Sequence, residues 1–185
     1  NYAGVRQLPV VFVVNNNQWA ISVPRSRQTN AQTLAQKAIG VGISGEQVDG
    51  NDVIAVRTSV ARALDRARSG AGPTLIEALT YRHADHTTAD DASRYRPDDE
   101  VSEQWARDPI SRLRALLVDA FGWGRDREEA LLEECQATID AAADAYLATT
   151  PSPSASMFDH LHARLPEPLA GQRDELLRHL GSSDE

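Results

Sequence analysis

The sequence predicts an α/β fold in which a parallel sheet is flanked by helices. An unbroken apolar run at residues 9–14 and a largely apolar run at residues 74–79 are predicted to be strands buried on both faces of a parallel sheet. Helical patterns over residues 33–41 and 53–67 lie between them, and this order of elements is typical of α/β proteins. The length of 185 residues predicts one domain, or one domain with a short appendage.

Composition and charge exclude several classes of protein. Hydrophobic residues make up 41% of the chain, as in globular proteins, and no apolar run approaches the roughly 18 residues of a membrane span. The formal net charge of −8 argues against a nucleic-acid partner, because such a protein needs a clustered basic face. A single cysteine, Cys135, excludes an intrachain disulfide and indicates a reducing compartment. The richness in Ala, Arg and Asp indicates a bacterial source, so we expect a bacterial cytoplasmic protein.

The boundaries of the predicted elements follow from local signals. The first strand ends at residues 15–17, three asparagines that tolerate turn geometry. A short extended piece is expected near residues 47–48, and Asp52 is a plausible N-cap for the helix that residues 69–73 end. The predicted apolar face of that helix comprises Val53, Val56, Val60, Ala63, Leu64 and Ala67.

The second half of the chain is predicted to be a long polar segment followed by helices. Residues 83–96 are too many and too polar for a simple connection, and such loops are usually functional or mobile. Asp108 and Pro109 are typical of the start of one helix, and Asp126 opens a longer helix that residues 151–154 break. This longer helix carries Leu131, Leu132, Cys135, Ile139, Ala142 and Tyr146, and the acidic tail is expected to lie along a surface.

These elements divide into two regions. We expect an α/β domain over residues 1–98 and a helical extension over residues 99–185 that packs on it. Two or three parallel strands make a poor independent sheet, since both faces and both edges need cover. Asn1 is not a start methionine, so we expect a fragment whose remaining strands lie upstream.

The polar run after the first strand is a candidate site, because ligands gather at the carboxyl ends of strands in open α/β sheets. An asparagine side-chain oxygen and a main-chain carbonyl two residues further along the chain can supply adjacent vertices of an octahedral Mg²⁺ site. Magnesium prefers a few protein oxygens alongside substrate phosphates. The alternative is an asparagine-rich turn without a ligand.

Several segments resemble one family in order along the chain. Residues 13–22, Val-Val-Asn-Asn-Asn-Gln-Trp-Ala-Ile-Ser, resemble the second half of the thiamine diphosphate motif, in which a Gly-Asp-Gly is followed by a closing Asn-Asn. This form is similar to the alpha subunit of the thiamine diphosphate-dependent decarboxylating component of 2-oxo acid dehydrogenase complexes. Residues 81–96 resemble the family's phosphorylation-loop segment, and residues 48–52, 72–77 and 105–113 match it as well.

The resemblance implies roles for four residues near the first strand. Asn17 matches the asparagine that binds Mg²⁺, and Trp19 matches the residue whose backbone carbonyl binds it. Ile21 matches the apolar wedge beneath thiamine diphosphate that keeps its two rings in a V shape. Ser22 lies close by, either in contact with the cofactor or loop or as an ordinary strand-end hydroxyl.

The polar loop carries the other two residues that the resemblance implicates. His86 matches a histidine beside the cofactor that serves acyl transfer, and imidazole suits that task because it exchanges a proton near neutral pH. Arg82 fits a cation that faces phosphate or anchors the loop, or one that pairs with Asp90 or Asp91. His83 is read as an ordinary loop histidine.

The resemblance also implies the fold, partners and chemistry. The expected fold is the C-terminal part of a thiamine diphosphate-binding domain, without the Gly-Asp-Gly carboxylate that completes the magnesium site. A beta subunit supplies a glutamate in a heterotetramer, and a lipoyl domain of the dihydrolipoyl acyltransferase accepts the acyl group. The substrate is pyruvate or a branched-chain 2-oxo acid, and the fragment alone is expected to be inactive.

Three alternatives remain at this point. An acetoin dehydrogenase alpha subunit shares the same motifs. A metal-dependent hydrolase would use His83, His86 and Asp90 as ligands. A non-catalytic interaction module would retain the helices without a cofactor.

Overall fold

A computed structural model describes residues 1–181 of the chain. The chain forms two compact units, Asn1–Gly124 and a second unit that begins at Arg125. The predicted division near residue 98 and the packing of the helical extension on the α/β domain stay predictions.

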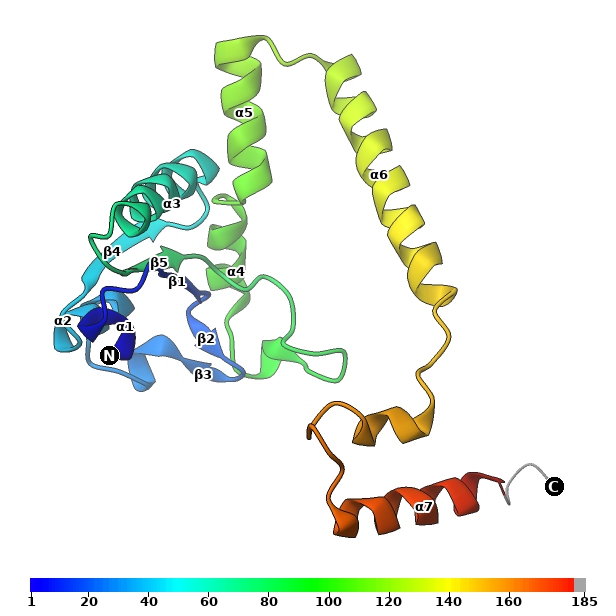
Figure 1. The fold of residues 1–185 in the computed structure, drawn as a ribbon. Helices are drawn as coiled ribbons and strands as arrows, with labels where there is room; N and C mark the ends of the chain where they lie inside the picture. The colour runs from blue at the N-terminus through cyan, green and yellow to red at the C-terminus, as the bar shows by residue number, and fades with distance from the viewer. Residues whose placement is uncertain (182–185) are drawn as a thin grey trace. The chain divides into compact units, whose positions relative to one another are not determined.

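A three-stranded parallel sheet forms the centre of the first unit (Figure 1). Its strands lie in the order β1 (Val11–Asn16), β5 (Thr74–Leu79) and β4 (Ser44–Asp49). The last residues of the three strands lie side by side, at the carboxyl end of the sheet. The structure therefore confirms the predicted α/β class and the parallel pairing. It corrects the prediction at β4, which is a full strand rather than a short extended piece.

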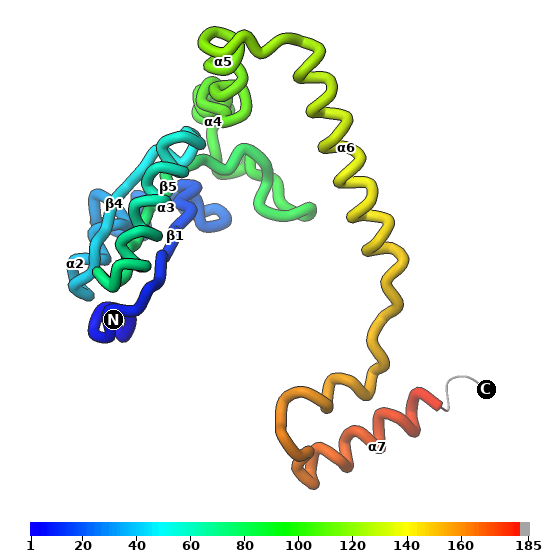
Figure 2. Tube along the Cα trace, turned by 45° about the horizontal axis from the view of Figure 1, so that its top comes forward, coloured from blue at the N-terminus to red at the C-terminus, as the bar shows by residue number. Residues whose placement is uncertain are grey.

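Different elements cover the two faces of this sheet. Helix α3 (Val53–Arg68) lies against one face, where its Ser59 hydroxyl donates to Glu46 of β4 (Figures 1 and 2). The neighbouring residue, Gly45, points to the other face, because successive strand residues alternate. There a Cβ on Gly45 would lie 2.6 Å from the Cβ of Ala38. Any residue larger than glycine at this position would therefore clash with the short helices that cover this face. They are the 3₁₀ turn η2 (Leu34–Gln36) and α2 (Lys37–Gly40), where a single helix was predicted.

Two burial predictions are wrong for the first unit. Strand β1 is not buried on both faces, since Phe12 is 42% exposed and Val13 is 56% exposed. Within residues 1–181, β1 pairs with β5 alone and so forms an edge of the sheet. The face of α3 that meets the sheet is also narrower than predicted, with Ser59, Ala63 and Ala67 buried and Val53 and Leu64 exposed.

The helix starts predicted at Asp52 and Asp108 are confirmed, whereas the helix predicted to open at Asp126 begins one residue earlier, at Arg125. Asp52 Oδ1 accepts hydrogen bonds from the second and third backbone amides of α3, both at 3.0 Å. Asp108 Oδ1 accepts the Ser111 amide at 2.8 Å, with Pro109 at the first position of α5 (Pro109–Phe121). The remaining elements of this unit are α1 (Tyr2–Val5), β2 (Trp19–Ala20), β3 (Val23–Pro24), η1 (Arg25–Arg27), η3 (Ala92–Arg94) and α4 (Asp98–Trp105).

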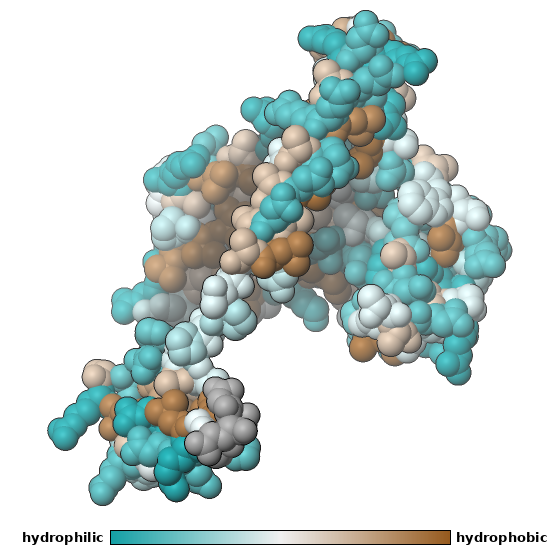
Figure 3. Space-filling view, turned by 90° about the vertical axis from the view of Figure 1, so that its right-hand side faces the viewer, coloured by the Kyte–Doolittle hydropathy of each residue, from teal (hydrophilic) through white to brown (hydrophobic). Residues whose placement is uncertain are grey.

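The second unit is helical. It contains α6 (Arg125–Leu147), η4 (Ser154–Phe158) and α7 (Glu167–Gly181), and α7 was predicted only as a surface tail. No residue of α6 is buried, and its apolar side chains lie on the surface, where Figure 3 shows them along the helix. Over the described residues, no helix has the length and apolarity needed to cross a membrane.

Candidate functional site

The three asparagines at the end of β1 make different contacts. Asn15 Oδ1 accepts the Thr80 hydroxyl at 2.5 Å on the exposed side of the turn. Asn16 is buried and uses both ends of its amide, because Nδ2 donates to Glu77 Oε1 at 2.5 Å and Oδ1 accepts the Gln18 amide at 3.1 Å. Asn17 follows the last residue of β1 and so lies at the carboxyl end of the sheet, half-buried, with its side-chain oxygen bonded to the Trp19 amide.

The oxygens at Asn17 and Trp19 fit a magnesium-type cation. Asn17 Oδ1 accepts one hydrogen bond, from the Trp19 amide at 3.1 Å, and an amide oxygen has a second lone pair. The Trp19 carbonyl belongs to a residue that pairs with Pro24, and proline has no N–H to donate to it. Hard oxygen atoms of this kind are the ligands that Mg²⁺ prefers, so these two residues fit as part of a coordination shell.

The turn of the β2–β3 hairpin has an unusual backbone. Ala20 pairs with Val23, so Ile21 and Ser22 form a two-residue turn, and both side chains are exposed. Ile21 has φ +55, a conformation that is rare for a β-branched residue and that such turns usually give to glycine. The Arg82 guanidinium holds this turn, because its Nη2 donates to the Ile21 carbonyl at 2.9 Å.

The same guanidinium organises the polar loop. Arg82 Nη2 also donates to the Tyr95 hydroxyl at 2.8 Å, and that hydroxyl donates to Asp90 Oδ2 at 2.5 Å. Asp90 Oδ2 in turn accepts the backbone amide of His86 at 2.8 Å. A continuous chain of hydrogen bonds therefore joins the Ile21 turn to the backbone of His86, and Arg82 is a loop anchor that reaches Asp90 through Tyr95.

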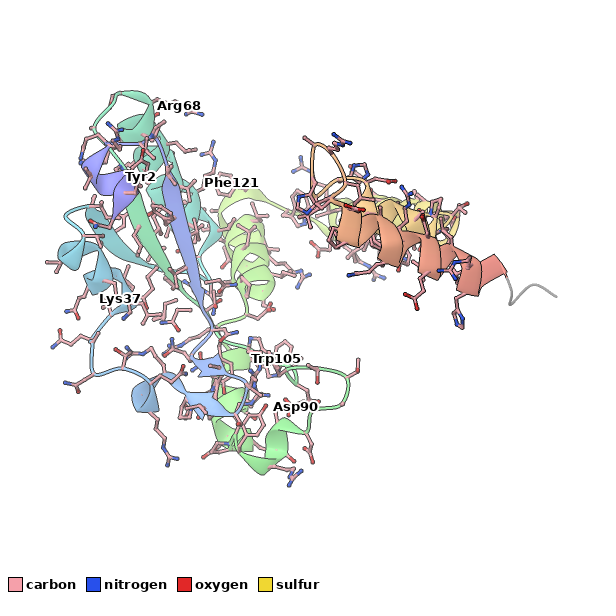
Figure 4. The ribbon with its side chains drawn as sticks, turned by 60° about the horizontal axis from the view of Figure 1, so that its bottom comes forward. Tyr2, Lys37, Arg68, Asp90, Trp105 and Phe121 are labelled. Carbon is pink, nitrogen blue, oxygen red and sulfur yellow. The ribbon has the colours of Figure 1, made fainter. Side chains whose placement is uncertain are left out.

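The base of the loop is buried beside α4. The buried Arg96 donates to the carbonyls of Arg82 and His83, the latter at 2.7 Å. The His83 ring stacks on Trp105 at 4.2 Å between centroids, which agrees with its reading as an ordinary loop histidine. Figure 4 shows Trp105 and Asp90 at the end of the sheet opposite to Tyr2.

Glu100 of α4 joins the hairpin to the end of β5. Its Oε1 accepts the indole N–H of Trp19 at 3.2 Å and the hydroxyl of Tyr81 at 2.8 Å. Burial, together with the hydrogen bond and negative charge of Glu100, raises the pKa of Tyr81 to about 12. The Tyr81 hydroxyl therefore keeps its proton over the whole physiological range, and it acts as a hydrogen-bond donor that fixes Glu100.

A cavity of about 1060 Å³ opens on the other side of this contact, at the carboxyl ends of β4 and β5. Arg112 lies in it with Asp49, whose carboxylate is 2.8 Å from the Arg112 guanidinium. Although burial alone raises the pKa of Asp49, the hydrogen bond and charge of Arg112 hold it below its usual value. Trp19 lines the cavity, but Asn17, Ile21, Ser22, Arg82 and His86 do not, so this cavity and the predicted site share one residue.

The structure brings most of the predicted residues into one neighbourhood. Asn17, Trp19, Ile21 and Ser22 lie in the segment after β1, and the Arg82 amide donates to the Asn17 carbonyl at 3.4 Å. The hydrolase alternative finds no support, because residues 1–181 contain no group of three His, Cys, Asp or Glu side chains placed to bind a metal. Sequence reasoning missed Glu77, Tyr95 and Glu100, although a carboxylate inside an apolar strand run was a usable signal for Glu77.

Asp90 is predicted to hold the loop in its observed conformation. The Tyr95 hydroxyl and the His86 amide, which both donate to it, hold the pKa of the Asp90 carboxyl below its ordinary value of 3.8. Its contribution is therefore present at neutral pH and is lost as the pH falls through that lowered pKa. We expect Asp90→Ala to speed tryptic cleavage after the exposed Arg94 severalfold, measured by mass spectrometry of timed digests. Thr88→Ala, at an exposed position of the same loop, is the control, and equal cleavage rates in the two variants would contradict the prediction.

Comparisons with known proteins agree with the resemblance. A sequence model described as "Dehydrogenase E1 component" matches residues 1–154. The chain is 45% identical over 173 residues to the pyruvate dehydrogenase E1 component subunit alpha of Staphylococcus aureus, which covers 93% of this chain and 47% of that one. It is also 45% identical over 185 residues to the 3-methyl-2-oxobutanoate dehydrogenase subunit alpha of Mycobacterium tuberculosis, covering 100% of this chain and 50% of the relative. The chain thus spans about half the length of the curated relatives it matches.

Proposed function

This chain belongs to the dehydrogenase E1 component family, and from that premise we propose that it forms part of the alpha subunit of a thiamine diphosphate-dependent 2-oxo acid dehydrogenase. The substrate is pyruvate or a branched-chain 2-oxo acid, the classes that the names of the two relatives indicate. A beta subunit and the lipoyl domain of a dihydrolipoyl acyltransferase are the proposed partners, in the bacterial cytoplasm. The remaining cation ligands and the glutamate that activates the cofactor come from outside this sequence.

The backbone of Ile21 is the observation that carries this proposal. A β-branched residue at positive φ costs about 1–3 kcal/mol, and such strain is retained mainly at functional sites. The hydrogen bond from Arg82 opposes relaxation of the turn and leaves the Ile21 side chain 55% exposed. An exposed, apolar side chain that is stiff at χ1 is what a wedge beneath a cofactor requires.

The other residues have roles that their chemistry supports. When bound, thiamine diphosphate supplies a nucleophilic carbon and an electron sink for the loss of carbon dioxide from the substrate. The oxygens of Asn17 and Trp19 would hold the Mg²⁺ that neutralises its diphosphate. Arg82 orders the hairpin and the loop together. The imidazole of His86 is exposed and would serve acyl transfer, and Ser22 offers a hydroxyl at the Ile21 turn.

Loss of the Asn17 amide tests the cation site. The test uses the full-length alpha subunit assembled with its beta subunit. We expect Asn17→Ala to raise the Mg²⁺ concentration for half-maximal thiamine diphosphate binding by at least about a hundredfold. Loss of a residue that only orients a metal ligand already lowers metal affinity by about 10–100-fold. Isothermal titration calorimetry with and without EDTA measures this. Asn15→Ala removes an identical side chain two residues earlier, one that bonds Thr80, and should bind as wild type does. Equal Mg²⁺ dependence of the two variants would argue against the site.

The substrate class is tested with the same assembled enzyme by decarboxylation of pyruvate and 3-methyl-2-oxobutanoate and by cleavage of acetoin. We expect turnover of one of the two 2-oxo acids that exceeds turnover of acetoin. A preference for acetoin would move the assignment to the acetoin dehydrogenase alpha subunit. Absence of Mg²⁺-dependent thiamine diphosphate binding would overturn the proposed function itself.

A further inference from the structure

Glu77 is a buried carboxylate that none of the roles above uses. It lies in β5, the central strand, and its side chain is fully buried. In the part of the chain that the structure describes, no lysine or arginine pairs with it. A buried carboxylate without a cation is costly unless hydrogen bonds compensate, so its position at the middle of the sheet requires an explanation.

Both oxygens of Glu77 accept hydrogen bonds from segments that flank the site. Oε1 accepts Asn16 Nδ2 at 2.5 Å, and Oε2 accepts the backbone amide of Ala35 at 2.9 Å. The first contact fixes the orientation of the Asn16 amide, because only its nitrogen can donate to a carboxylate. The Asn16 oxygen is thereby turned to the Gln18 amide, which it accepts at 3.1 Å.

The bond to Gln18 shapes the turn that presents the proposed cation ligands. Gln18 has φ +70, a left-handed conformation that non-glycine residues adopt only when their surroundings impose it. Gln18 lies between Asn17 and Trp19, so its conformation sets the direction of the side-chain oxygen before it and of the carbonyl after it. A rotation of the Asn16 amide would leave the Gln18 amide facing a second N–H donor.

We propose that Glu77 is the positioning residue of the cation-binding turn, acting through the Asn16 amide on the Asn17 and Trp19 oxygens. This inference rests on the proposed function and names a residue that determines how tightly its cation is held. Glu77 has two donors to satisfy, Asn16 Nδ2 and the Ala35 amide. A carboxylate can accept from both of them, one at each oxygen, whereas a glutamine side chain has only one oxygen that accepts. Glu77→Gln can accept from only one of its two partners: its N–H₂ group faces either Asn16 Nδ2, which forces Asn16 to rotate away from Gln18, or the Ala35 amide, which then loses its acceptor.

An exchange of the two residues should restore the hydrogen bonds. In Asn16→Asp/Glu77→Gln, the glutamine nitrogen donates to one aspartate oxygen, and the other aspartate oxygen accepts the Gln18 amide. The glutamine oxygen still accepts the Ala35 amide. The pair thus keeps the number of hydrogen bonds, the side-chain volumes and the net charge, and it changes only which residue carries the charge.

The experiment uses the full-length alpha subunit assembled with its beta subunit, with Mg²⁺ titrated against thiamine diphosphate binding by calorimetry. We expect Glu77→Gln to raise the half-saturating Mg²⁺ concentration by about 10–100-fold, the range for partners that orient metal ligands. Asn16→Ala removes the same hydrogen bond by deleting its donor, and it should raise the half-saturating Mg²⁺ concentration by a similar factor. This variant keeps the test possible if Glu77→Gln fails to assemble with the beta subunit. The exchange variant should recover most of the wild-type Mg²⁺ affinity.

Glu46→Gln is the matched control for general damage to the sheet. Glu46 lies on β4, and its partners are Ser59 and Arg62 of α3, so its loss affects the sheet but not the turn. We expect Glu46→Gln to lower the melting temperature without changing the Mg²⁺ requirement. Wild-type Mg²⁺ dependence in Glu77→Gln and Asn16→Ala, or an exchange variant as impaired as the single ones, would overturn the inference. If the wild-type enzyme itself fails to bind thiamine diphosphate, the proposed function fails instead.

Discussion

Replacement of Arg82 by alanine is expected to lower kcat/KM of the assembled enzyme by at least about a hundredfold, the effect of a displacement of about 1 Å at a reacting group. Arg82 makes three side-chain hydrogen bonds, to the Ile21 carbonyl, the Tyr95 hydroxyl and the Ala84 carbonyl, at 2.9, 2.8 and 3.2 Å. Its guanidinium thus bonds both the hairpin turn and the loop, beside the ring contact between Trp19 and Tyr95 at 5.7 Å. Without it, the turn that carries Ile21 and the segment that carries His86 lose their common anchor.

Arg82→Lys should be almost as impaired, which separates geometry from charge. Two of the three hydrogen bonds come from one guanidinium nitrogen and the third from Nε, and a lysine ammonium cannot reproduce this planar arrangement. Steady-state kinetics with free 2-oxo acid and with the lipoyl domain measure the two half-reactions. Arg94→Ala removes an exposed arginine from the same loop and should leave both unchanged. Near wild-type rates in Arg82→Lys would mean that a positive charge at this position is sufficient and that the hydrogen bonds of the guanidinium to the hairpin turn and the loop are not needed.

Elements with a strong local signal could be predicted from the sequence, and elements defined by their neighbours could not. Strand β5 is a largely apolar run, and the start of α5 is an Asp-Pro pair, so each carries its own information. Strand β4 reads Ser-Gly-Glu-Gln-Val-Asp, which has little strand propensity, and it is extended because it pairs along its whole length with β5. Tertiary pairing therefore overrides local composition there.

Burial was the less predictable property. The composition of β1 indicates an environment with apolar contacts on both faces, yet Val13 is 56% exposed in the described structure. The apolar side chains that α6 carries are likewise exposed. Side-chain type indicates which surfaces favour burial, but burial itself depends on what is packed against them, and a single stretch of sequence does not contain that information.

The candidate site divides in the same way. Asn17, Trp19 and Ile21 fall within five consecutive residues, so a motif can identify them. Glu77 contacts Asn16 across 61 positions and Ala35 across 42, and Glu100 contacts Trp19 across 81. These supporting carboxylates are invisible to a local pattern, because their function is defined only by the three-dimensional contact.

The second large effect is expected at Ile21, where stability and activity should change in opposite directions. Ile21→Gly removes the backbone strain at φ +55, which costs about 1–3 kcal/mol. Glycine also adds chain entropy to the unfolded state, which offsets about 0.5–1 kcal/mol of that gain. The net effect should stabilise the assembled enzyme by about 1 kcal/mol. The burial lost is small because the side chain is 55% exposed. Activity should fall steeply, since glycine offers no surface to support the cofactor.

Two further substitutions at the same position separate strain from the wedge. Ile21→Leu keeps a large apolar side chain without the branch at Cβ, so it should retain most of the activity and gain a little stability. Ile21→Asn tolerates positive φ but is polar, so it should gain stability and lose activity as Ile21→Gly does. Differential scanning calorimetry and decarboxylation rates measured on the same preparations provide the comparison. The proposed wedge is an apolar side chain on a strained turn that Arg82 holds. If Ile21→Gly keeps its activity, or is less stable than wild type, the strained turn does not serve the cofactor.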